Sequence, residues 1–258
     1  MVIRAFILVT FILFTASAYA GSWQKLSRGG FSSVDIYTPD SVSSIGQGRA
    51  LLIVLHGCAQ AISAFRTANL AQAAEAHGMV IAVPDAENKA GFSCWSYWQG
   101  AISRSAADYR NLIQLANDLV GSNQYLIDAD QVYIAGLSSG ATFANTTACL
   151  APDIFAGVGV SAGPSIGTSA NGAIGSCEQA DVASRCLLYA GSFASHFDTQ
   201  LTSVAHARND TTVNTCYNEQ NAEGMAAVYG VNREAGVSFI DDGQGNPVSY
   251  THLRAHET

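Results

Sequence analysis

The stretch from Val132 to Gly140, Val-Tyr-Ile-Ala-Gly-Leu-Ser-Ser-Gly, decides the fold of this chain. Its apolar run ends in Gly-x-Ser-x-Gly, and the small residues from Ala141 to Leu150 can continue as a helix. A strand, this pentapeptide and a helix together form the context of a nucleophile elbow, in which the serine hydroxyl stands at the top of a sheet. The helix would direct its N-terminal amides toward negative charge that develops beside the hydroxyl. The pattern therefore predicts Ser138 as a nucleophile.

Apolar runs elsewhere in the chain alternate with helical segments. Helices are expected at 62–77, ending at Gly78, and at 105–120, ending at Gly121. Buried strands that alternate with helices predict an α/β fold, with a mostly parallel sheet and helices on both faces. The expected strands are an early edge strand at Val34–Tyr37, followed by Leu51–Leu55, Met79–Val83, Val132–Ala135, Gly157–Val160 and Thr202–Ala207.

The first twenty residues resemble a signal peptide rather than part of the fold. Arg4 supplies a positive start, Ala5–Phe14 is apolar, and Ala18-Tyr19-Ala20 fits a cleavage site. The apolar run is shorter than the ~20 residues that a membrane-spanning helix needs. Secretion is therefore expected, with no membrane anchor, and residues 21–247 are expected to form one domain with a substantial core.

Charge and cysteine content exclude several functional classes. Only 12 Lys and Arg residues and a net charge of −8 argue against nucleic acid as a partner. All six cysteines follow residue 20, which favours disulfides in an exported chain, and the 15 possible pairings remain open. There is no Cys-x-x-Cys pair, no phosphate loop, and no glycine spacing that fits dinucleotide binding. We expect no metal, no cofactor and a monomeric chain.

A serine nucleophile requires a general base, and a carboxylate must orient that base. In α/β hydrolases the chain order is Ser, then Asp or Glu, then His. Asp210 follows the strand expected at Thr202–Ala207, and catalytic groups of such sheets gather at the carboxyl ends of strands. Asp210 is therefore the candidate acid, and its alternative role is an Asx turn or a helix cap. Weaker candidates are Asp198, Asp241 and Asp242.

The sequence His56-Gly57-Cys58 closes the strand expected at Leu51–Leu55. Such a strand end supplies one backbone N–H of an oxyanion hole, and the residue after the nucleophile supplies the other. We assign these donors to the amides of Cys58 and Ser139. His56 itself is expected to be a buried structural residue.

Several segments together resemble the extracellular poly(3-hydroxybutyrate) depolymerase family of esterases. They are His56 to Gln60, Cys94-Trp95, Val132 to Ala141, and Asp210 to Val213. The resemblance implies an α/β-hydrolase domain that is secreted and cleaves esters, with Ser138 as nucleophile, Asp210 as acid and Cys58 in the oxyanion hole. It also suggests a disulfide between Cys58 and Cys94.

An aromatic group made of Trp95, Tyr97 and Trp98 follows Cys94. Trp95 and Trp98 are candidate substrate-binding residues, because their rings could stack on an apolar polyester chain. Tryptophans that pin a loop to the core are the alternative.

The sequence departs from the family where the catalytic histidine should lie. Only His252 and His256 follow Asp210, both within residues 248–258, whose sequence resembles the translation of a synthetic sequencing linker. We therefore expect residues 248–258 to be non-native. The natural histidine, with any C-terminal polymer-binding domain, would then lie outside this sequence, and the 258-residue chain would be nearly inactive. His196 and His206 precede Asp210 and are out of order, and His77 is expected at a helix end.

The leading hypothesis is a secreted serine esterase acting on a hydroxyalkanoate polymer or small esters through an acyl-enzyme. One alternative is a feruloyl or acetyl xylan esterase acting on plant polysaccharide. A second alternative is a non-catalytic polymer-binding protein on a hydrolase scaffold.

Overall fold

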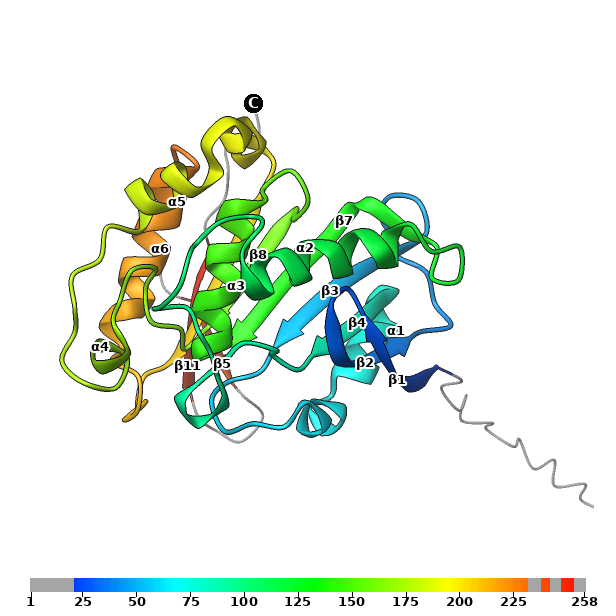
Figure 1. The fold of residues 1–258 in the computed structure, drawn as a ribbon, viewed down its shortest axis with the longest axis horizontal. Coiled ribbons are helices and arrows are strands. Elements are labelled where there is room, and N and C mark those ends of the chain that lie inside the picture. The colour runs from blue at the N-terminus through cyan, green and yellow to red at the C-terminus, as the bar shows by residue number, and fades with distance from the viewer. Residues whose placement is uncertain (1–20, 232–237, 242–246, 253–258) are drawn as a thin grey trace, which may run out of the picture.

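The computed structural model describes residues 21–231, 238–241 and 247–252, the last two ranges by their backbone alone. The expected signal peptide at 1–20 lies outside these residues. Within them, nine strands form one sheet (Figure 1). In order across the sheet they are β1 (Ser22–Arg28), β2 (Phe31–Thr38), β4 (Met79–Pro84), β3 (Arg49–Leu55), β7 (Ile127–Leu137), β8 (Gly157–Ser161), β9 (Leu201–Ala207), β11 (Pro247–His252) and β10 (Ser238–Asp241).

The five central strands, from β4 to β9, are parallel, and the strands outside them pair antiparallel with their neighbours. A short hairpin of β5 (Lys89–Ala90) and β6 (Cys94–Trp95) stands apart from the main sheet. The helices are α1 (Leu70–His77), α2 (Ala107–Val120), α3 (Ser139–Leu150), α4 (Ala170–Ile174), α5 (Val182–Ala190) and α6 (Cys216–Val228). Single 3₁₀ segments cover Ile62–Thr67, Gly91–Ser93 and Gly191–Asp198.

Helices cover both faces of the sheet, as predicted. On β3, Leu51, Ile53 and Leu55 pack in the main core with α2 and α3, which cross the sheet in Figure 1. The intervening Leu52 and Val54 pack on the other face with residues of α1. Side chains that alternate between two buried faces explain why the central strands are continuous apolar runs.

The expected α/β architecture and its five buried strands are confirmed, with two corrections. Val34–Tyr37 lies in β2, but β2 is not an edge strand because β1 pairs with its outer side. The helix expected at 62–77 is interrupted: the 3₁₀ segment ends at Thr67, and Asn69 has φ +58° before α1 begins. A left-handed residue cannot continue an α-helix, so the segment is divided into two.

Three disulfides join the six cysteines, which settles the pairing that the sequence left open. Cys58–Cys94 is the expected bond, and the others are Cys149–Cys186 and Cys177–Cys216. Each closes a loop of 36 to 39 residues. In the described part of the chain, no helix is both long and apolar enough to cross a bilayer.

Candidate active site

Ser138 lies at the sharp turn between β7 and α3. Its backbone angles, φ +55° and ψ −121°, are ones that side-chain-bearing residues rarely adopt. The turn is fixed because the Ser138 amide donates to Ser161 O at 2.9 Å, and Ser138 O accepts from Ala141 N and Thr142 N at 3.0 and 3.2 Å. Strain that persists because its surroundings enforce it is typical of functional sites.

The two glycines of the motif are required by close backbone packing. A Cβ on Gly136 would lie 2.7 Å from Ala141 N and closer still to the Gly140 carbonyl. A Cβ on Gly140 would lie 2.7 Å from Leu55 O and closer still to His56 O. The second contact shows that α3 begins directly against the end of β3, where the His56-Gly57-Cys58 segment starts.

Gly57 lies beside the candidate nucleophile, since a Cβ built on it would be 3.4 Å from Ser138 Cβ. Cys58 follows, and no hydrogen bond between described residues occupies its amide. Ser139 is the first residue of α3, and the first amides of a helix have no acceptor within it. The structure therefore places Ser139 and the segment that carries Cys58 next to the Ser138 turn.

Two hydrogen bonds and a disulfide hold the segment that carries Cys58. The Gly57 amide donates to Gln60 Oε1 at 2.6 Å, and the Ala59 amide donates to Phe92 O at 2.7 Å. The disulfide from Cys58 to Cys94 bonds the same two segments covalently. These contacts fix the position of the Cys58 amide before any substrate binds.

His56 is fully buried, so its expected structural role is confirmed. Burial lowers its pKa, although the hydrogen bond with Gly57 O and the nearby Asp85 act in the opposite direction. Gly57 O can only accept, so Nδ1 carries the proton and donates to it at 2.8 Å. That carbonyl belongs to the same rigid peptide unit as the Cys58 N–H, and His56 therefore orients the candidate oxyanion donor.

Asp210 lies three residues beyond the end of β9. Its Oδ1 accepts from Thr212 N at 2.8 Å and from Val213 N at 3.0 Å, which is the expected Asx turn. Burial raises its pKa, but these amides and the neighbouring His206 outweigh burial and leave the pKa below its usual value. Asp210 is thus an ionised carboxylate in a fixed orientation, which suits a triad acid as well as a turn.

The contact between His206 and Asp210 was missed by the sequence reasoning. His206 Nε2 lies 3.1 Å from Asp210 Oδ2 and 3.2 Å from Val213 O. Since the Val213 carbonyl can only accept, Nε2 is protonated and donates to both. The signal that could have revealed it is the four-residue spacing between His206 and Asp210 across a strand end.

No base for Ser138 is found among the residues whose side chains the structure describes. Among these residues, no hydrogen bond joins Ser138 Oγ to an imidazole ring. His252 pairs with Ser203, which is level with Gly159 and Ala135 across the sheet. This register places His252 before the carboxyl end at which the Ser138 turn begins. His256 lies outside the described residues.

The aromatic group after Cys94 belongs largely to the core. Trp95 has no exposed surface and packs against Phe31, His56 and Phe143. The prediction that Trp95 contacts substrate is therefore wrong, because a ring without exposed surface cannot stack on a polymer. Trp98 is partly buried, lies edge-on to the buried Tyr97 at 4.9 Å, and stays a candidate.

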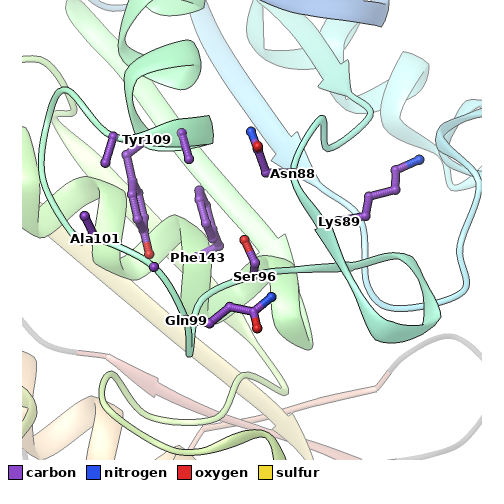
Figure 2. A pocket seen from close by; sticks show the side chains of 10 residues that line it. Asn88, Lys89, Ser96, Gln99, Ala101, Tyr109 and Phe143 are labelled. Carbon is purple, nitrogen blue, oxygen red and sulfur yellow. The ribbon is translucent and has the colours of Figure 1, made fainter.

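A pocket of about 610 Å³ opens beside the N-terminus of α2 (Figure 2). The rings of Tyr109 and Phe143, stacked at 4.1 Å, form its apolar wall, and Ser96 and Gln99 add polar atoms. Neither Ser138 nor Asp210 lines it, so the pocket is distinct from the candidate active site. Within the described ranges, no three His, Cys, Asp or Glu residues gather closely enough to hold a metal ion.

A mostly parallel sheet with a strained serine turn between strand and helix, and an aspartate after a later strand, is the arrangement of an α/β hydrolase. Residues 33–235 match the Esterase PHB depolymerase model, and the chain belongs to that family of esterases.

The curated relatives include depolymerases and an acetylxylan esterase. Poly(3-hydroxybutyrate) depolymerase of Ralstonia pickettii is 37% identical over 274 residues, covering 97% of this chain and 56% of the relative. Acetylxylan esterase A of Emericella nidulans is 31% identical over 123 residues, covering 47% of this chain and 38% of the relative. The chain thus spans about half of these relatives' length or less.

Solved structures support the fold. Acetyl xylan esterase from Aspergillus awamori has a TM-score of 0.63 at 19% identity, with 82% of this chain and 81% of that chain covered. An S-formylglutathione hydrolase from Agrobacterium tumefaciens has a TM-score of 0.53 at 15% identity, with 81% and 84% covered. At these identities the likeness extends to the α/β-hydrolase fold alone.

Proposed function

We propose that this chain is a secreted serine esterase that hydrolyses esters of short hydroxyalkanoates, with poly(3-hydroxybutyrate) or its oligomers as substrate. The observation that carries the proposal is the strained Ser138 turn packed against the Gly57-Cys58 segment. The family match and the 37% identical depolymerase support the choice of substrate.

In the proposed reaction, Ser138 Oγ attacks the ester carbonyl carbon while a histidine ring accepts the hydroxyl proton. The amides of Cys58 and Ser139 bind the oxygen that becomes negative in the tetrahedral intermediate. The intermediate collapses to an acyl-enzyme, and the histidine returns the proton to the departing alcohol. Water then cleaves the acyl-enzyme by the same steps. Asp210 would stabilise the charged ring with its ionised carboxylate.

The histidine that accepts the Ser138 proton is the part of this mechanism with the least structural support. Ser138 has no histidine partner among the residues whose side chains are described, and the register places the His252 backbone before the carboxyl end of the sheet. We propose that the 258-residue chain turns over on the order of 10⁶-fold more slowly than an esterase with a complete triad. Hydrolysis of p-nitrophenyl butyrate near an ordinary ~10 s⁻¹ would refute this. His206→Ala and His252→Ala variants would then identify the base in use.

The proposal extends to the organisation and location of the protein. Residues 21–247 would form a monomeric α/β-hydrolase domain, preceded by a cleaved signal peptide at 1–20 and followed by a non-native segment at 248–258. Three disulfides among six cysteines favour an oxidising, extracytoplasmic location. Mass measurement of the exported chain would test cleavage after Ala20.

Covalent labelling tests the nucleophile without requiring turnover. A fluorophosphonate, with imidazole added as a substitute for the missing base, should modify Ser138, located by peptide mass mapping after long incubation, and the Ser138→Ala variant should remain unmodified. Absence of label at Ser138 would contradict the proposal and favour a non-catalytic polymer-binding protein.

Esters of plant polysaccharide are the second candidate substrate, because acetylxylan esterases occur among both the sequence relatives and the structural neighbours. Single-turnover acylation should proceed faster with p-nitrophenyl butyrate and hydroxybutyrate oligomers than with methyl ferulate or acetylated xylan. The reverse order would select the second candidate.

A further inference from the structure

Phe92 is an exposed aromatic residue in an unusual backbone conformation. It lies in the 3₁₀ turn Gly91–Ser93 with φ +59°, and 88% of its surface is exposed, more than for any other large apolar side chain in the described residues. A bulky residue at positive φ is a true outlier, and glycine would adopt the same turn without strain. The turn itself therefore does not explain the phenylalanine.

This turn is fastened to the candidate oxyanion segment. Phe92 O accepts from the Ala59 amide at 2.7 Å, and Cys94, two residues later, is disulfide-bonded to Cys58. Gly57, the residue before Cys58, lies beside Ser138. This hydrogen bond and this disulfide are two independent links. Together they hold the Phe92 turn against the segment that contains Cys58, the proposed oxyanion donor.

We propose that Phe92 is a substrate-contacting residue whose ring packs on the methyl and methylene groups of an ester positioned at Ser138. This inference rests on the proposed function and names one of its apolar contacts. An exposed ring gains stabilisation only when a partner covers it, and a hydroxybutyrate ester carries a methyl group on every repeat unit. Because two links fix the turn, little conformational entropy is lost when that contact forms.

The chain offers a matched control in Leu126. It is also apolar, has φ +51° and is 61% exposed. It immediately precedes β7, whereas Ser138 follows the other end of that strand. Replacing Leu126 by alanine therefore makes the same kind of change at the opposite end of β7.

The test is the dissociation constant of the methyl ester of a linear 3-hydroxybutyrate trimer, measured by calorimetry on the full chain. Phe92→Ala should raise the constant about tenfold, the scale expected for half-burying a large apolar side chain. Phe92→Leu should recover most of the loss, and Leu126→Ala should bind as the wild type does. Equal binding by wild type and Phe92→Ala, or no trimer binding by the wild type, would overturn the inference.

Fluorophosphonate labelling of Ser138, run with added imidazole as the substitute base, separates this inference from the proposed function. If the trimer binds in a Phe92-dependent manner while Ser138 stays unlabelled, the contact stands and the esterase proposal fails. If Ser138 is labelled and trimer binding ignores Phe92, the contact alone is refuted.

Discussion

Gly140→Ala should disrupt the candidate site, because the single added methyl group would clash with neighbouring backbone. The new Cβ would lie 2.7 Å from Leu55 O, 2.9 Å from Leu55 C and closer still to His56 O, whereas real Cβ contacts stay above 3.0 Å. All three atoms belong to the backbone at the end of β3, so no side chain can move aside. The start of α3 and the end of β3 must separate by several tenths of an ångström.

That separation acts on stability and on chemistry. Overpacking of this kind costs about 1–3 kcal/mol, which urea unfolding should show as a lower midpoint. Gly57 and Cys58 follow the end of β3, so the proposed oxyanion donor moves relative to Ser138. A displacement approaching 1 Å lowers reaction rates about 100-fold, and Ser138 labelling by a fluorophosphonate should slow accordingly.

Gly91→Ala is the control, because a Cβ there meets nothing within 4 Å. It should unfold at the wild-type midpoint and label at the wild-type rate. Wild-type stability and labelling in Gly140→Ala would show that α3 does not pack on the β3 backbone as described.

Three further outcomes are expected. Trp95→Ala should lower the free energy of unfolding by about 3–5 kcal/mol because the ring is wholly buried, and Trp98→Ala should cost clearly less; equal urea midpoints would contradict the core role of Trp95. The pKa of Asp210 is lower in the folded state, so its charge stabilises the fold above about pH 4, and this contribution is lost as pH falls through the lowered pKa. The stability gap between wild type and Asp210→Asn should therefore be constant from pH 7 to 5 and close at lower pH in acid titrations. Replacing both Cys58 and Cys94 by serine should cost about 2–4 kcal/mol in thermal unfolding and slow Ser138 labelling, while loss of stability without slower labelling would refute the link to the site.

The sequence predicted the parallel core because its signals are local. Leu51–Leu55 and Met79–Val83 lie in strands covered on both faces, so each is a continuous apolar run that stands out in the sequence. The glycines around Ser138 mark the turn within five consecutive residues, although the contacts that require Gly140 come from the distant residues Leu55 and His56. The outer strand β1 escaped prediction because Ser22–Arg28 is largely exposed and mixes polar with apolar residues.

Contacts between segments that are far apart in the sequence were not predicted, for a different reason. Trp95 and Trp98 look alike in sequence, and only the packing of Phe31, His56 and Phe143 around the first separates a core ring from a candidate contact. His206 was excluded by a rule on chain order, yet a strand end and a tight turn bring its ring to Asp210. Side-chain direction at a strand terminus is a tertiary property that spacing alone does not define.

The candidate site shows how one peptide unit can be held by unrelated parts of the chain. The unit between Gly57 and Cys58 receives a hydrogen bond from the buried ring of His56 at its carbonyl and a disulfide from Cys94 at its side chain. Nδ1 of His56 donates to Gly57 O at 2.8 Å, while Nε2 lies 3.3 Å from Asp85 Oδ1 and 3.4 Å from the Ala86 amide. The hydrogen bond restricts the peptide unit itself, and the disulfide restricts the residue that carries its N–H. An amide fixed in this way stabilises a developing oxyanion without reorganising, which is the condition under which backbone donors contribute most to catalysis.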